Sequence, residues 1–159
     1  MSLFLPGAFV PRLFHLAFNR LDTLNEQLVR GREDVFFGYI FDAEATIKLP
    51  DYAVKYYADG FASSRAALGG SFGFYRAWDA TTEQNRNRKA TKLTMPVLAI
   101  GGETGSGDSP LALMQTVANQ VQGLNIPGAG HFVAEETPDA LLAGLTTFLA
   151  QYRDGSPAR

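Results

Sequence analysis

The sequence predicts an α/β fold in which a helical region precedes a small parallel sheet. Helical signals run from about Leu21 to Thr91, whereas strand and helix signals alternate from Leu93 onward. The run from Met95 to Gly101 is short, apolar and ends in glycine, which is typical of a buried parallel strand. Strand, helix, strand, helix is the order that builds a parallel sheet with helices on its faces.

This change of character divides the 159 residues into three segments. We expect a helical segment with a preceding linker over residues 1–92, an α/β segment over 93–153 and a polar tail over 154–159. Two strands do not make a stable sheet by themselves. We therefore expect either self-association or a missing N-terminal half to complete the sheet.

Capping residues and glycines divide the helical segment. Thr23 followed by Glu26 fits a capping box, and Gly31 is suited to end that helix. Leu21, Leu24 and Leu28 lie on one face of it. Further helices are predicted over about 32–45 and over 50–58, the second closed by Gly60. A helix is also predicted over 61–78, although Gly69, Gly70 and Gly73 weaken its pattern. Residues 81–91 are predicted to form a short helix or a linker.

The α/β segment offers a second strand and two helices. Val121 to Ile126 is the second strand, and Ser109 with Pro110 opens a helix that runs to about Asn119. The last helix begins at Thr137 and Pro138, with apolar residues at helical spacing: Leu141, Leu142, Leu145, Phe148, Leu149 and Tyr152.

Composition excludes several classes of protein. The net charge is −2, and the local basic cluster of Arg86, Arg88, Lys89 and Lys92 fits a solvated face, so we expect no nucleic-acid partner. With no cysteine, disulfides, thiolate zinc sites and cysteine nucleophiles are excluded. No apolar run approaches the ~20 residues of a membrane-spanning helix. The apolar start lacks the basic region of a signal peptide, so we expect a cytoplasmic protein with no membrane partner.

The candidate chemistry centres on His131. This histidine lies in a glycine-rich loop, NIPGAGHF, directly after the second predicted strand. Loops at the carboxyl ends of parallel strands are where α/β folds carry their functional residues. Gly128 and Gly130 allow a sharp turn, and histidine can act as a base near neutral pH. A capping or packing histidine is the structural alternative.

The order of several short motifs resembles one family. MPVLAIGGE (95–103) and IPGAGHFVAEETPDALLAGLTTFL (126–149) resemble the C-terminal end of the α/β-hydrolase fold. HLAF (15–18), LVRGRED (28–34) and GFYRAW (73–78) resemble the cap of its epoxide hydrolase and haloalkane dehalogenase branch. The resemblance implies the C-terminal part of an α/β-hydrolase fold: a helical cap followed by the last two parallel strands and their helices.

What the resemblance implies for function is cofactor-free hydrolysis of a small apolar epoxide. An aspartate attacks an epoxide carbon to give an ester, and water activated by the histidine base, matched here by His131, hydrolyses that ester. His15 and Tyr75 match the cap residues that hydrogen-bond the epoxide oxygen, although each is also a plausible core residue in its aromatic surroundings. Leu16 stands where similar fluoroacetate dehalogenases carry a tryptophan, which favours epoxides over haloalkanes or haloacids as substrates.

The same resemblance implies an incomplete site. The family's nucleophilic aspartate and its oxyanion donors belong to the N-terminal half of the fold, so we expect the 159 residues to be inactive alone. For the orienting acid, Glu103 and Asp108 are the two candidates within the sequence.

Two further alternatives stay open. Gly69-Gly-Ser71-Phe-Gly73 matches the G-x-S-x-G pattern of serine esterases, but the residues before it read as helix, whereas a nucleophile elbow follows a strand. The other alternative is a non-catalytic fragment that dimerises or binds a partner through an exposed sheet edge and apolar surface.

Overall fold

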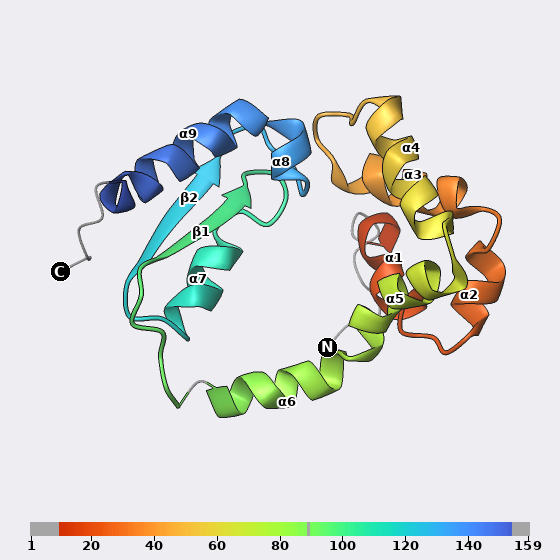
Figure 1. Ribbon diagram of the computed structural model, residues 1–159, viewed down its shortest axis with the longest axis horizontal. Helices are drawn as coiled ribbons and strands as arrows, with labels where there is room; N and C mark the ends of the chain where they lie inside the picture. The colour runs from red at the N-terminus through yellow and green to blue at the C-terminus, as the bar shows by residue number, and fades with distance from the viewer. Residues whose placement is uncertain (1–9, 89, 154–159) are drawn as a thin grey trace. The chain divides into compact units, whose positions relative to one another are not determined.

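A computed structural model describes residues 10–88 and 90–153, and side chains from Leu13 onward (Figure 1). The predicted polar tail (154–159), residues 1–9 and Lys89 lie outside the described residues. The described chain forms two compact units. The helical unit comprises the described residues up to Glu44 together with Lys48–Asn87. The α/β unit comprises Ala45–Ile47 and the described residues from Arg88 onward.

The helical unit contains the following elements: α1 (Val10–Phe18), α2 (Leu24–Val29), α3 (Glu33–Glu44), α4 (Asp51–Ala62), α5 (Arg65–Arg76) and α6 (Trp78–Arg88). Its hydrophobic core is a cluster of four buried side chains, Val29, Phe37, Leu68 and Phe72. The rings of Phe37 and Phe61 stack with centroids 4.0 Å apart, which extends the core to the end of α4. The aromatic density predicted for the second helix thus serves packing.

The predicted capping box at Thr23 is wrong. Thr23 has a φ of 57° and its side chain caps no N–H group. Instead, the side chain of Asn25 accepts a hydrogen bond from the backbone N–H of Glu26 at 2.9 Å. The leucine face of α2 is not its buried face, because Leu24 is 49% exposed and Leu28 is 51% exposed, whereas Asn25 and Val29 are buried.

Other helix boundaries differ for local reasons. The helix α4 continues through Gly60, which was expected to end it. The helix α1 lies in a region for which no helix was predicted, and Pro11 lies in its first turn. A proline in the first turn of a helix removes only an N–H group that has no partner there, so it does not interrupt the helix.

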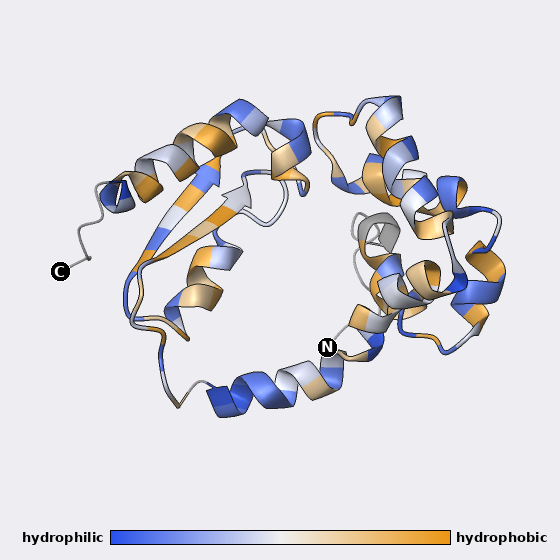
Figure 2. Ribbon diagram, viewed as in Figure 1, coloured by the Kyte–Doolittle hydropathy of each residue, from blue (hydrophilic) through white to orange (hydrophobic). Residues whose placement is uncertain are grey.

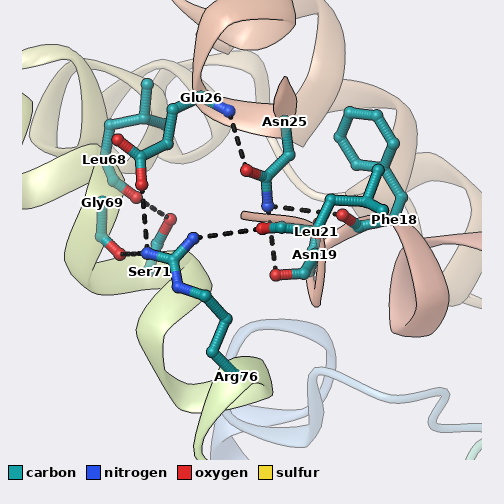
Figure 3. A network of polar contacts seen from close by, with 9 residues as sticks. All are labelled: Phe18, Asn19, Leu21, Asn25, Glu26, Leu68, Gly69, Ser71 and Arg76. Carbon is teal, nitrogen blue, oxygen red and sulfur yellow. Dashed lines mark hydrogen bonds and ion pairs between the residues drawn. The ribbon is translucent and has the colours of Figure 1, made fainter. Parts of the chain in front are cut away.

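A polar network joins α2 to α5 and accounts for one of the three glycines of α5 (Figure 3). The Arg76 guanidinium donates to Oε1 of Glu26 at 3.0 Å, to the carbonyl of Gly69 at 2.9 Å and to the carbonyl of Leu21 at 3.3 Å. A Cβ atom at Gly69 would lie 3.2 Å from Oε1 of Glu26, so this glycine lets the two helices approach closely. Arg76 therefore fixes the C-terminal end of α5, next to Tyr75.

The same network includes a buried amide. Asn25 is fully buried, and its side chain donates to the carbonyls of Asn19 at 3.1 Å and Phe18 at 3.3 Å (Figure 3). These bonds satisfy carbonyl groups at the C-terminal end of α1, where a helix leaves acceptors without internal partners. Asn25 thus links α2 to the end of α1, the helix that carries His15.

The α/β unit contains two parallel strands, β1 (Val97–Gly102) and β2 (Val121–Ile126), paired in register from Val97↔Val121 to Gly102↔Ile126. Figure 1 shows α7 (Ser109–Gln115) and α9 (Pro138–Leu149) to either side of the strands, as expected for strand–helix alternation. The short helices α8 (Val133–Glu136) and η1 (Ala150–Tyr152) precede and follow α9. The predicted parallel sheet is confirmed, and β2 has the predicted bounds.

The helix α6 has a different character from the rest of the helical unit. None of its described residues is buried, and Figure 2 colours most of it as hydrophilic. Arg86, a member of the basic cluster, pairs with Glu83 at 3.0 Å on this exposed surface. Over the described ranges, no helix combines the length and the apolar character needed to cross a bilayer.

Candidate functional site

His131 lies at the carboxyl edge of the two-stranded sheet. Since β1 and β2 end in register at Gly102 and Ile126, the loops that follow them leave the sheet side by side. His131 belongs to the second of these loops, and its side chain is exposed, with its ring edge-on to that of Phe132 at 5.1 Å. The position is the one at which open α/β sheets carry their chemistry.

The backbones of the two loops approach each other so closely that only glycine, which has no side chain, fits at the points of contact. A Cβ atom at Gly105 would lie 2.5 Å from the carbonyl oxygen of Gly130 and 2.8 Å from the backbone nitrogen of His131. A Cβ atom at Gly102 would lie 2.0 Å from that same carbonyl oxygen. Gly128 has a φ of 72°, which an L side chain rarely adopts. The loop that carries His131 therefore has little room to shift.

Each of the two candidate acids accepts a hydrogen bond from the chain near the carboxyl end of β2. Glu103, directly after β1, accepts a hydrogen bond at 2.9 Å from the backbone N–H of Gly128. Asp108 accepts a longer bond, 3.2 Å, from the side-chain amide of Asn125. Glu103 thus binds the segment between β2 and His131, whereas Asp108 binds a residue of β2 itself. Their assignment as orienting acid stays a prediction.

The carboxylate of Glu136 accepts four backbone hydrogen bonds. Glu136 is only 7% exposed. Its Oε2 accepts three backbone N–H groups, at 2.8 Å from Thr46, 2.9 Å from Ile47 and 2.8 Å from Gly130. Its Oε1 accepts the N–H of Phe132 at 2.8 Å. This interaction explains why residues 45–47 belong to the α/β unit although they lie between α3 and α4 in the sequence.

These contacts set the protonation behaviour of Glu136. Burial acts to raise the pKa of Glu136, but the four backbone hydrogen bonds outweigh it, so that the pKa lies below its ordinary value of 4.5. A carboxyl group with a lowered pKa in the folded state stabilises the fold fully above its unfolded-state pKa. That contribution is lost as the pH falls through the folded-state pKa.

We therefore expect Glu136→Gln to remove an acid-sensitive part of the stability. The free energy of unfolding of the wild type should exceed that of the variant most at neutral pH, and the difference should shrink as the pH falls from about 7 to about 3. Denaturant unfolding at a series of pH values measures this difference. A difference that stays constant over the whole range would contradict the assignment.

In the helical unit, the structure brings together the two cap residues that the resemblance implies. His15 of α1 is buried, and its ring contacts that of Tyr75 of α5 edge-on, with centroids 5.8 Å apart and planes at 88°. Nδ1 of His15 lies 3.3 Å from Oε1 of Glu44, whose side chain is also buried. Phe14 contacts the same imidazole at 6.2 Å. The cluster thus combines the polar side chains of His15, Tyr75 and Glu44 with the apolar ring of Phe14.

Ser71 does not lie in a nucleophile elbow. It sits inside α5, and its hydroxyl donates to the carbonyl of Leu68 at 2.7 Å, as helical serines commonly do (Figure 3). The element before α5 is the helix α4, whereas the elbow requires a strand there. This context argues against Ser71 as a nucleophile.

Two residues of these clusters were not found from the sequence. Glu44 ends a helix with no local sign of its contact with His15. Glu136 differs in no visible way from its neighbour Glu135, because its partners at Thr46 and Ile47 lie about 90 residues away in the sequence. A local pattern carries no information about such pairs.

Known proteins were compared with the chain in sequence and in structure. No family model matches the chain. A soluble epoxide hydrolase from Corynebacterium sp. (strain C12) is 39% identical over 70 residues, which are 44% of this chain and 24% of that protein.

Many solved structures match over most of the chain, and two of them follow. The wild-type Cfl2 protein of Burkholderia cenocepacia has a TM-score of 0.82 and 31% identity, over 92% of this chain and 51% of its own. The Cif epoxide hydrolase of Acinetobacter nosocomialis has a TM-score of 0.79 and 25% identity, over 86% of this chain and 44% of its own. The chain therefore spans about half the length of these proteins. With its helical unit, its two parallel strands and these similarities, the chain has the fold of the C-terminal half of an α/β hydrolase, and the proteins it resembles include epoxide hydrolases.

Proposed function

We propose that the chain supplies the base and the substrate-binding half of an epoxide hydrolase that needs no cofactor. The observation that carries the proposal is the contact of His15 with Tyr75, since two side chains far apart in sequence meet as the resemblance requires. Relatives that are epoxide hydrolases by name support the same chemistry.

The proposed reaction has two steps. In the first, an aspartate from the N-terminal half of the fold attacks an epoxide carbon; a carbon–oxygen bond forms as the ring carbon–oxygen bond breaks, and the freed oxygen receives hydrogen bonds and a proton from the His15–Tyr75 pair. In the second, His131 takes a proton from water, which attacks the ester and releases the diol and the aspartate. His131 then releases its proton to solvent and the pair regains a proton from solvent, so that epoxide and water are consumed and a diol is formed.

The surroundings of the pair favour a small apolar substrate. Phe14 contacts the His15 ring, and the ring of Phe14 also lies edge-on to that of Tyr39 at 5.6 Å. Apolar side chains around two polar donors are typical of a small-molecule site, in which the donors fix the orientation. Donors that face the oxygen on which charge develops lower the barrier to ring opening.

The test supplies the N-terminal half. The part of Cfl2 that this chain does not match is joined ahead of the 159 residues, and formation of diol from a styrene-oxide-type epoxide is measured. We expect diol from the chimera, none from the 159 residues alone, and a loss of at least ~10²-fold in the His131→Ala chimera, since a positioned general base contributes about 10²–10⁴-fold.

Ser71→Ala is the matched control for this experiment, because it alters a hydroxyl in the helical unit that binds only its own helix. Its diol formation should equal that of the parent chimera. A folded chimera in which His131→Ala retains full activity, or diol formation by the 159 residues alone, would contradict the proposal.

A second candidate is a non-catalytic fragment that associates with itself. The observation that favours it is apolar surface in the α/β unit, where Met95, Leu113 and Leu142 are each more than 60% exposed. Each strand of the two-stranded sheet also has an edge that no other described strand pairs. Unpaired edges and large apolar patches promote association. Sedimentation of the 159-residue chain as a dimer, with no activity in the chimera, would favour this candidate.

A further inference from the structure

The backbone on both sides of His131 is bound to a single carboxylate. The N–H of Gly130, directly before the histidine, donates to Oε2 of Glu136, and the N–H of Phe132, directly after it, donates to Oε1, each at 2.8 Å. The carboxylate thus bridges the peptide groups that flank His131. It fixes the position and direction of the Cα–Cβ bond of a residue whose own side chain is exposed.

The same carboxylate binds a third stretch of chain. Oε2 also accepts the N–H groups of Thr46 and Ile47, at 2.8 and 2.9 Å. The hydroxyl groups of Thr46 and Thr104 form a hydrogen bond, and Thr104 donates to the carbonyl of Ala129 at 2.9 Å. Segment 46–47, the loop after β1 and the loop after β2 are therefore connected around one buried anion.

The chain packs closely around the Glu136 carboxylate. A Cβ atom at Gly130 would lie 2.6 Å from the backbone nitrogen of Thr46 and 2.9 Å from each carboxylate oxygen of Glu136. Since the neighbours are backbone and a carboxylate that accepts four hydrogen bonds, a shift of either would break some of these bonds. Charge-assisted hydrogen bonds are the stronger kind, and here four converge on one group.

We propose that Glu136 is the positioning residue of His131, holding the histidine at the carboxyl edge of the sheet by binding the amides on either side of it. Its significance for catalysis rests on the proposed function of His131. The positioning itself does not, because it is a property of the backbone. Glu136 contacts no reacting atom in this scheme and acts through the loop alone.

The experiment uses the 159-residue chain and two measurements on Glu136→Gln. The first is amide hydrogen exchange. A glutamine keeps the shape but lacks the charge and turns an N–H₂ group toward one of the donors. We expect exchange at positions 46, 47, 130 and 132 to become at least ~10-fold faster, equivalent to about 1.4 kcal/mol. Amides of the β1–β2 ladder should keep their wild-type rates.

The second measurement is a spectroscopic signature of His131 that a general loss of stability would not produce. The chain has two histidines, so its imidazole spectrum contains two sets of signals, which His131→Gln assigns. In Glu136→Gln we expect the His131 signals to broaden or to split, while those of buried His15 stay unchanged. Asp139→Asn is the matched control: it also removes one carboxylate from the first turn of a helix, but an exposed one, and should change neither measurement.

Wild-type exchange rates and an unchanged His131 spectrum in a folded Glu136→Gln chain would overturn the proposal. If the variant does not fold, the wild type provides the test through couplings across hydrogen bonds. Correlations from the four amide nitrogens to the carboxylate carbon of Glu136 are expected, and their absence would overturn the proposal. None of these measurements uses an epoxide, so failure of the proposed reaction and failure of the positioning role are told apart.

Discussion

Phe72→Ala is expected to lower the free energy of unfolding of the helical unit by about 3–5 kcal/mol, the usual cost of truncating a buried phenylalanine. Phe72 is fully buried and belongs to the central cluster of the helical unit. Its ring contacts those of Phe36 at 6.0 Å and Phe37 at 6.5 Å, which lie on α3. The truncation would leave a cavity between α3 and α5 that rigid rings on α3 fill poorly. Native-state hydrogen exchange at the amides of α3 and α5 measures the loss.

Phe74→Ala provides the matched control. It is the same substitution in the same helix, two residues along, but the side chain of Phe74 is 82% exposed. Its effect should stay within about 0.5 kcal/mol, as is usual for surface positions. Equal losses in the two variants would show that the described core does not hold this unit together.

The second large effect is expected from Gly130→Ala. The φ angle at Gly130 is not positive, so an alanine has no conformational strain there; the obstacle is space. Its methyl group would push against Thr46 and the Glu136 carboxylate, which must then give up hydrogen bonds from buried donors. We expect the α/β unit to lose about 3 kcal/mol or more, since overpacking and broken buried bonds add.

The comparison for Gly130→Ala is Gly70→Ala. Gly70 lies in α5, and a Cβ atom there would meet no atom within 4 Å. Because alanine favours helix more than glycine does, this variant should be more stable by about 0.5–1 kcal/mol. Hydrogen exchange resolves the two units separately. A Gly130→Ala chain with an unchanged α/β unit would contradict the described crossing of the loops.

The elements that the sequence predicted well are those in which local pattern and tertiary environment agree. The second strand has its predicted bounds, and α3 (Glu33–Glu44) closely matches its predicted range. Both are bounded by turn-forming residues, since Gly31 precedes α3 and Pro127 with Gly128 follows β2.

The misses have tertiary causes. At Thr23 the capping pattern was present, but the carboxylate of Glu26 is bound by Arg76, which lies 50 residues away. In α5 the glycines predicted a weak helix, whereas Gly69 is where Glu26 approaches closely. Partners at such separations override local propensity and leave no mark in a short window of sequence.

The candidate site divides in the same way. A histidine in a glycine-rich loop after a strand is visible in the sequence, and the described position of His131 is the expected one. The roles expected of His15 and Tyr75 rest on the family resemblance. Without it, their aromatic surroundings would indicate only core packing. Glu44 and Glu136 were not predicted, because their contacts are with residues far away in the sequence.

The central claim, that His131 acts in the second of two steps, is tested most directly by intact protein mass. The His131→Ala chimera with the Cfl2 half is exposed to the epoxide, and its mass is followed with time. We predict that the protein gains the mass of one epoxide and retains it, because the ester forms but its hydrolysis lacks the base. The parent chimera should show no lasting gain while it forms diol. A His131→Ala chimera that gains no mass, or that loses the adduct as fast as the parent, would contradict the account.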